Sequence, residues 1–126
     1  LPHSIHDNAL RDGGEESLVK MYHDMLLKSL EKQDGKARGQ AFSFDQAWHL
    51  YRLAFVDYAR MVISIFFKGA SPAAFQARAD NPNVGFVYRN VAASLNYLQM
   101  LDQHLHYVEQ LAASAFKTPA DQSSKI

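Results

Sequence analysis

Residues 42–69 read FSFDQAWHLYRLAFVDYARMVISIFFKG, and this stretch decides the fold. Ser43 and Gln46 form a capping box, in which the two side chains satisfy backbone N–H groups at the start of a helix. Neither proline nor glycine interrupts the stretch before Gly69, a residue type that commonly follows the last helical turn. We therefore predict one long helix over residues 44–68.

This predicted helix is apolar on more sides than a helix at the surface of one domain requires. About half of its circumference is apolar and is expected to face the core. Its other side is mostly polar but carries four large apolar residues, which are Leu53, Val56, Ile63 and Phe67. Together with the flanking Arg52 and Arg60, we predict that they form a contact surface for another protein. Two alternatives stay open: a chain end folds back over them, or a tilted helix buries them in the bundle.

Two further long helices and a short one are predicted from apolar spacing and from capping residues. Apolar residues recur three and four positions apart over residues 15–32 and again over residues 84–116. Ser71 followed by Pro72 predicts the start of a short helix over residues 72–79. No segment alternates with the two-residue period of a strand. We therefore predict an all-α fold, an up-down bundle of three long helices with one short connecting helix.

The chain ends are predicted to lie outside this bundle. The length of 126 residues fits one domain. Residues 1–14 contain proline, glycine and Asp or Asn without an apolar period, which predicts an extended arm. Residues 117–126 are small and polar, which predicts a disordered tail. The helical bundle domain is therefore expected over residues 15–116.

The predicted core draws on all three long helices. Nine anchors are expected, and these are Tyr22, Leu26, Trp48, Tyr51, Phe55, Tyr58, Leu98, Leu101 and Leu105. Along the last helix, small or apolar residues alternate four and three positions apart over residues 87–115, a heptad seam that favours near-parallel packing. We expect this seam to pack within the chain. A homodimer through the 87–115 seam is the weaker alternative, because its flanking positions lack paired charges.

Composition excludes several classes of function. Thirteen Lys and Arg balance 13 Asp and Glu, so no net charge steers the chain toward nucleic acid. With no cysteine, disulfides and thiolate chemistry are excluded. No stretch is long and apolar enough for a transmembrane helix. The sequence begins Leu-Pro without methionine, so we expect a processed product, a fragment or a chain with an incomplete start. The sequence does not determine the compartment; we expect a soluble intracellular protein, with an organellar location open if a targeting segment has been removed.

One group of residues has the spacing of half a metal site. Asp102, His106 and Glu109 lie at i, i+4 and i+7 on one face of the last predicted helix, and such side chains ligate zinc or harder cations. Further ligands would have to come from elsewhere, and His23 is the candidate helper. Because charged residues on a helix face usually form a solvated stripe, we expect neither metal nor cofactor.

Two segments have residue patterns that a known family shares. The first reads ESLVKMYHDMLLKSLEKQ and spans residues 16–33, and the second reads FSFDQAWHLYRLAFVDYARMVISIFF and spans residues 42–67. The first fits a helix pattern L-x-x-x-Y-x-x-x-L, and the second opens with an aromatic residue and a Tyr-Arg pair. The positions that match are Leu18, Tyr22 and Leu26 in the first segment and Trp48, Tyr51 and Arg52 in the second.

This arrangement resembles the C-terminal helical part of ecdysteroid-kinase-like and choline-kinase-like phosphotransferases, which belong to the aminoglycoside-phosphotransferase superfamily. The resemblance covers about residues 1–110 and implies a region that helps to wall an acceptor-substrate cleft. The family's phosphate-covering loop, phosphate-binding Lys, H-x-D-x-x-x-x-N loop and metal-binding Asp have no counterpart in this sequence. His6-Asp7-Asn8 has the wrong spacing, and His23-Asp24 has no Asn in register. No catalytic residue is therefore carried over.

Two functions are expected from these observations. The first is a non-catalytic helical protein-interaction module or accessory subunit that docks onto a larger protein assembly. The alternative is the C-terminal substrate-cleft subdomain of a kinase-like small-molecule phosphotransferase whose catalytic part lies outside this sequence. The length of the native chain distinguishes them, because the second function requires a protein several times longer than 126 residues.

We expect this chain neither to bind ATP with Mg²⁺ nor to transfer its phosphate. The physical reason is that the elements which hold nucleotide and metal in such kinases have no counterpart in the sequence. Isothermal titration calorimetry with ATP, with and without Mg²⁺, checks this. Micromolar binding that depends on Mg²⁺ would show the prediction to be wrong.

Overall fold

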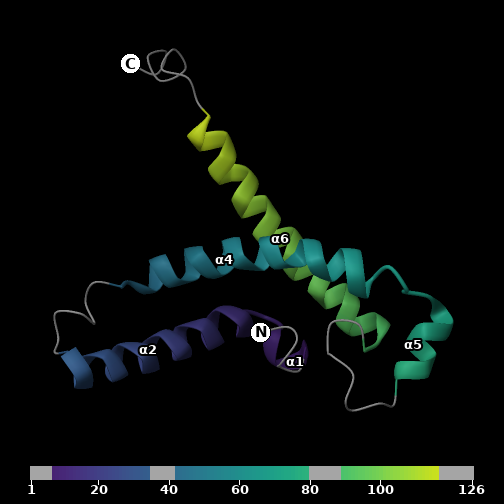
Figure 1. The fold of residues 1–126 in the computed structure, drawn as a ribbon, viewed down its shortest axis with the longest axis horizontal. Helices are drawn as coiled ribbons and strands as arrows, with labels where there is room; N and C mark the ends of the chain where they lie inside the picture. Colours follow the sequence, from purple (N-terminus) through teal and green to yellow (C-terminus); the bar gives the residue numbers. More distant parts are fainter. Residues whose placement is uncertain (1–6, 35–41, 80–88, 117–126) are drawn as a thin grey trace.

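The structure is a computed structural model of the chain and describes residues 7–34, 42–79 and 89–116. Within these ranges the fold is all-α without any strand, which confirms the predicted fold class (Figure 1). The predicted tail over residues 117–126 lies outside the described residues. The elements are α1 (Asp7–Leu10), α2 (Gly14–Asp34), α4 (Phe44–Met61), the π-helical turn η1 (Val62–Phe66), α5 (Pro72–Arg78) and α6 (Val91–Ala115).

Side-chain caps define where three of the helices begin. The predicted capping box is present at Ser43, and Ser71 caps α5 through its side chain. The side chain of Asn90 accepts a hydrogen bond of 2.8 Å from the N–H of Ala93, so α6 begins directly after Asn90. This is later than the predicted start, and residues 84–88 of the predicted helix lie outside the described residues.

The end of α4 differs from the predicted helix, which continues as regular α-helix to Lys68. The α-helix instead ends at Met61, and the N–H of Phe67 donates to the carbonyl of Val62 at 3.2 Å. This i→i+5 bond makes a wider turn than an α-helix and shifts the face that the following residues present. As a result, both Phe66 and Phe67 pack against the core.

Residues 7–10 of the predicted arm form a helical turn instead of an extended chain, and residues 1–6 of that arm lie outside the described residues. Leu10, the last residue of α1, is buried in the core. The chain then reverses through Asp12 and Gly13, whose φ angles are 53° and 81°. A Cβ atom on Gly14 would lie 2.0 Å from the carbonyl oxygen of Ala9, so this close approach requires glycine. The turn brings the start of α2 against the core.

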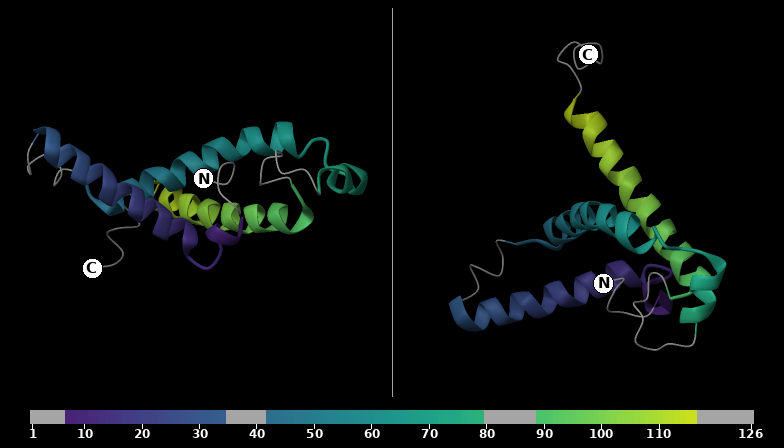
Figure 2. Two further views of the ribbon diagram at one scale, coloured as in Figure 1. Left: turned by 90° about the horizontal axis from the view of Figure 1, so that it is seen from below. Right: turned by 45° about the vertical axis from the view of Figure 1, so that its right-hand side comes forward.

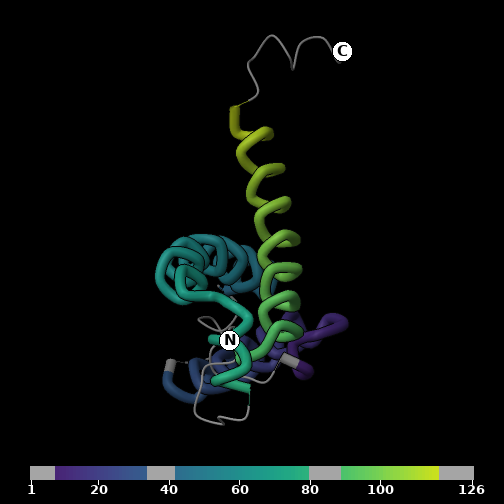
Figure 3. The backbone as a smooth tube through the Cα atoms, turned by 90° about the vertical axis from the view of Figure 1, so that its right-hand side faces the viewer, coloured from purple at the N-terminus to yellow at the C-terminus, as the bar shows by residue number. Residues whose placement is uncertain are grey.

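The central helix is α4. Both α2 and α6 pack on it, and α1 contacts α2 and α6. The helices α2 and α4 run antiparallel, and α6 crosses α4 obliquely (Figure 1). The C-terminal half of α6 extends beyond the other helices, as Figure 3 shows most clearly. Figure 2 shows α5 beyond the end of η1, on the side where α6 begins.

The core lies where α1, α4 and α6 meet. Its buried members are Leu10, Phe55, Ala59, Val62, Tyr97 and Met100. Among the nine predicted anchors, Phe55 is buried, and Leu26, Trp48, Tyr51 and Leu101 are partly buried. The prediction is wrong for the four that are exposed, which are Tyr22 (67%), Tyr58 (46%), Leu98 (42%) and Leu105 (40%).

The errors on α6 have one physical cause. The buried residues of this helix are Ala93, Ser94, Tyr97, Met100 and His104. Apart from Ser94, itself a seam position, each of them comes one residue before a seam position, 94, 98, 101 or 105. One residue corresponds to a rotation of about 100° around the helix. The seam pattern favours leucine, whereas the packed rings belong to Tyr97 and His104, whose centroids lie 5.3 and 4.6 Å from that of Phe55.

We expect Phe55→Ala to lower the free energy of unfolding by about 3–5 kcal/mol, because it leaves a cavity in the core. The matched control is Leu50→Ala on the same helix. Its side chain is 54% exposed, so the loss there should stay below about 1 kcal/mol. Urea denaturation followed by circular dichroism measures both values. Equal losses would contradict the assignment of the core.

Candidate functional site

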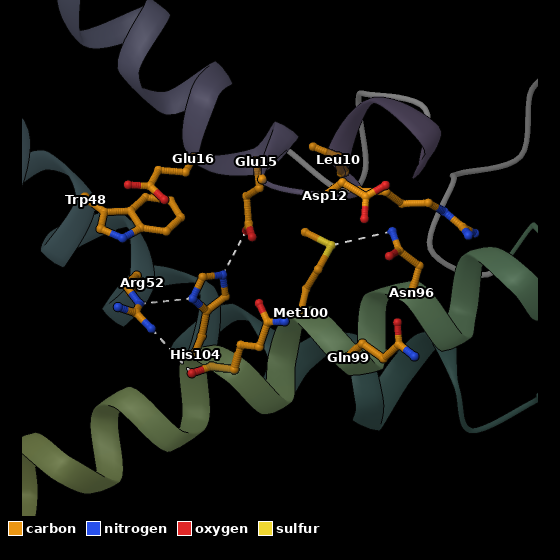
Figure 4. A pocket seen from close by; sticks show the side chains of 13 residues that line it. Leu10, Asp12, Glu15, Glu16, Trp48, Arg52, Asn96, Gln99, Met100 and His104 are labelled. Carbon is orange, nitrogen blue, oxygen red and sulfur yellow. Dashed lines mark hydrogen bonds and ion pairs between the residues drawn. The ribbon is translucent and has the colours of Figure 1, made fainter.

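A buried polar network joins the three long helices. Oε1 of Glu15, at the start of α2, accepts a 2.6 Å hydrogen bond from the hydroxyl of Tyr51 and a 2.9 Å bond from Nε2 of His104. Nε of Arg52 donates to Nδ1 of His104 at 3.3 Å (Figure 4). An arginine can only donate, so Nδ1 is an acceptor and the imidazole proton lies on Nε2. His104 therefore bridges a carboxylate and a guanidinium.

Aromatic rings surround His104. The ring centroids of Phe55, Trp48 and Tyr51 lie 4.6, 5.7 and 6.0 Å from that of His104. Only 2% of the surface of His104 is exposed. A polar ring in such a place must have both nitrogen atoms hydrogen-bonded, because an unpaired buried polar atom is costly. Glu15 and Arg52 meet that requirement.

The guanidinium of Arg52 is half-buried between α4 and α6. It lies 3.8 Å above the centre of the Tyr107 ring, and its NH2 group donates to the carbonyl of Gln103 at 3.4 Å. The hydroxyl of Tyr107 in turn forms a 2.6 Å hydrogen bond with Nδ1 of His49. These contacts lie between α4 and α6. The network therefore also fixes how α6 crosses α4.

Two tyrosines, the partly buried Tyr51 and the buried Tyr97, stay protonated. Burial raises the pKa of Tyr51 far above its usual range, and the hydrogen bond and the charge of Glu15 raise it further. Burial also raises the pKa of Tyr97 to about 12, with a smaller contribution from Tyr58. Tyrosine in the unfolded chain ionises near pH 10. The raised pKa values in the folded state therefore stabilise the fold fully below pH 10, and this stabilisation is lost as the pH rises through the folded pKa. Tyr51 thus acts as a hydrogen-bond donor and not as a base.

A polar pocket of about 520 Å³ opens beside the network (Figure 4). Asp12 and Glu16 contribute to one wall, Trp48 to a second, and Gln99 and Met100 of α6 to a third. Acidic, basic and amide side chains dominate its lining. The described residues that line it include no Ser, Thr, Cys or Lys. Its chemistry suits binding of a small polar molecule.

An apolar groove of about 530 Å³ lies between α2 and α4. Among its α4 residues, Tyr51 also contacts His104 of α6, whereas Ala47, Leu50 and Ala54 line the groove beside it. Beyond the groove, exposed residues follow along α4 and into η1 at spacings of three and four. We call this set the outer stripe of α4, and it consists of Leu50, Ala54, Tyr58 and Met61 of α4 together with Ile65 of η1. Side chains of α2 that line the groove include Leu18, Tyr22 and Leu26.

The predicted metal half-site lies on the exposed side of α6. Asp102, His106 and Glu109 are all exposed there. His23, the candidate helper, is buried between α2 and α4, where its Nε2 donates to the carbonyl of Phe42 at 2.8 Å. Among the residues that the structure describes, no three His, Asp or Glu side chains are grouped so that they could hold a metal ion.

The six predicted interface residues occupy different environments. Arg52 belongs to the buried network, and Phe67 packs against the core with its ring centroid 6.2 Å from that of Tyr97. Leu53 and Val56 are partly buried, whereas Arg60 and Ile63 are exposed. Arg60 pairs with Asp57 on the surface. Whether these residues contact another protein stays a prediction.

Sequence reasoning misses the Glu15–His104 pair. The helix dipole already explains an acidic residue in the first turn of a helix, so the sequence offers no reason to predict a buried partner for Glu15. His104 lies between two positions of the leucine seam. The one available signal is that Tyr97, Met100, His104 and Tyr107 are themselves three and four residues apart, which places them on one helix face.

The chain matches no protein-family model, no curated protein and no solved structure. The two segments that resemble kinase-like phosphotransferases correspond to α2 and to α4 with η1, which pack against each other. None of the described helices is both long enough and apolar enough to cross a membrane.

We expect Glu15→Ala to lower the free energy of unfolding by about 2–4 kcal/mol, because two buried donors, on Tyr51 and His104, lose their acceptor. Glu16→Ala, at the exposed neighbouring position, is the matched control and should cost less than about 1 kcal/mol. Urea denaturation gives both values. If Glu15→Ala lowers the free energy of unfolding no more than Glu16→Ala does, the network does not stabilise the fold.

Proposed function

We propose that this chain is a non-catalytic helical module that docks onto another protein through the α2–α4 groove and the outer stripe of α4. The observation that carries the proposal is the apolar exposure on this side, where 67% of Tyr22 and 61% of Ile65 are exposed. Large contiguous apolar surfaces are rare on monomeric proteins and commonly mark interaction sites. The surface joins two helices, so it is broader than a scatter of single exposed residues.

The shape of the groove supports an amphipathic helix of the partner as the occupant. α2 and α4 run side by side, and α6, the third long helix, packs on a different face of α4. The groove between the first two helices therefore has the form that a further helix fills in a bundle. A helix bound in such a groove buries residues at i, i+3, i+4 and i+7. The spacing of the outer stripe, three and four residues, matches that pattern.

A second candidate function rests on the polar pocket. The pocket is lined partly by Glu16, Trp48 and Arg52, and these belong to the two segments that resemble kinase-like phosphotransferases. On this proposal the chain is the C-terminal cleft subdomain of a longer enzyme, and the rest of that enzyme covers the α2–α4 groove. Mass spectrometry of the native protein separates the two functions, since only the second requires a longer chain.

We expect the double variant Leu50→Glu with Ile65→Glu to lose docking while the fold remains. Both side chains are exposed, so the thermal midpoint should change little, whereas two carboxylates in an apolar interface are strongly unfavourable. A photo-cross-linking residue at position 54, inside the groove, reports docking in the native cells as an adduct of one defined mass. Asp45→Lys, at an exposed position on another face of α4, is the control and should keep the adduct.

Two results would count against the proposal. If the double variant keeps the adduct, the groove is not the docking site. If instead the double variant unfolds, Leu50 and Ile65 stabilise the isolated chain. Their apolar side chains then no longer indicate a docking site.

A further inference from the structure

The outer side of α6 carries apolar and acidic residues in regular alternation. We call this set the outer stripe of α6, and it consists of Leu98, Asp102, Leu105 and Glu109. Spacings of four, three and four residues place them on one face of the helix. Neither acidic residue forms an ion pair with another described residue. The helix from Val91 to Ala115 contains no Lys or Arg, so the stripe has no neutralising charge of its own.

The last residue of this stripe, Glu109, lies toward the end of α6 that stands apart from the other helices, whereas Leu98, Asp102 and Leu105 lie on the outer side of the turns that carry the buried Tyr97, Met100 and His104. The C-terminal half of α6 extends beyond the other helices in Figures 1 and 3, and residues 112–116 are all exposed. A few helical turns without tertiary packing are only marginally stable in water, because most helical stability in proteins comes from packing of an apolar face. A surface that covers the stripe would supply this packing.

A second copy of α6 is a poor cover for this stripe. Parallel pairing of two such stripes places Asp102 opposite Asp102 and Glu109 opposite Glu109. An antiparallel pair also contains four carboxylates and no basic residue. Like charges in contact weaken association. The surface that covers the stripe should therefore combine apolar with basic side chains.

The chain itself carries such a surface on α2. We call it the outer stripe of α2, and it consists of Met21, Met25, Lys28 and Lys32. Its spacings are also four, three and four residues. Met21 and Met25 are 55% and 63% exposed, and a shallow groove of about 420 Å³ runs beside them. Neither lysine forms an ion pair with another described residue.

We propose that two copies of this chain form a dimer in which the outer stripe of α6 on each copy packs against the outer stripe of α2 on the other. Methionine and leucine side chains bury one another, and the lysines reach Asp102 and Glu109. The long lysine stems can cover apolar surface while their charges pair at the rim. The contact is made twice, so it closes under two-fold symmetry. The α2–α4 groove uses a neighbouring face of α2 and stays open to a different partner.

A parallel register of α2 against α6 of the other copy suits the dipole of α6. It brings Met21 opposite Leu98, Met25 opposite Asp102, Lys28 opposite Leu105 and Lys32 opposite Glu109, so that Lys28 lies between the two acidic residues. It also places both lysines near the C-terminal end of α6, where the helix dipole favours positive charge. Matching heptad-like spacings on both helices suit near-parallel packing.

Charge reversal tests this pairing of stripes. Sedimentation equilibrium of the chain should show a dimer at low salt that weakens at ~1 M salt, where the Debye length is about 3 Å. Lys28→Glu with Lys32→Glu should weaken the dimer at least about tenfold, and so should Asp102→Lys with Glu109→Lys. An equimolar mixture of the two variants should dimerise again, because each of its two contacts then joins opposite charges.

The outcomes that would overturn the dimer are distinct. They are a wild-type chain that stays monomeric, a reversed variant that dimerises as well as the wild type, or a mixture that fails to recover. Far-UV circular dichroism shows whether each variant is folded. A charge-reversed pair that does not fold is replaced by the milder pair Lys28→Gln with Lys32→Gln or Asp102→Asn with Glu109→Gln. Each of these milder pairs should also weaken the dimer. Leu50→Glu, in the α2–α4 groove, should leave the dimer intact, which separates this test from that of the proposed function.

Discussion

The carboxylate of Glu15 is the constraint on which the rest of the structure depends. It is buried at the start of α2 and accepts hydrogen bonds from Tyr51 of α4 and His104 of α6. A buried carboxylate is tolerated only when donors replace its water shell. The three helices must therefore approach at one point with their polar groups aligned. The tight turn before α2, which requires glycine at position 14, places the carboxylate there.

The meeting of the three helices at Glu15 also determines the two surfaces on which the proposals rest, the α2–α4 groove and the outer stripe of α6. The network holds α6 against one face of α4 through His104 and Arg52, so another face of α4 remains beside α2 as an apolar groove. The oblique crossing also carries the second half of α6 away from the other helices. One of the two surfaces is the apolar groove between α2 and α4, and the other carries alternating leucines and acidic residues on α6. Both proposals thus derive from the same arrangement of helices.

Much of the secondary structure could be predicted from local chemistry. Ser43 and Ser71 mark helix starts through side chains that cap the backbone, and such signals involve neighbouring residues only. The core could not be predicted as well, because leucine spacing on α6 indicates a face one residue away from the buried one. The choice between the two faces is made by Tyr97 and His104, whose rings are packed although their polar atoms suggest exposure. Their role depends on Phe55 and Glu15, residues distant in sequence.

The central claim is that Glu15 and His104 act as one energetic unit across 89 positions of the sequence. A double-mutant cycle of Glu15→Ala and His104→Ala, measured by urea denaturation, tests it most directly. Removing either partner leaves the other unpaired, so the second substitution should cost less than it does alone. We expect a coupling free energy of about 1–3 kcal/mol between the two residues. Effects that add within about 0.5 kcal/mol would contradict it.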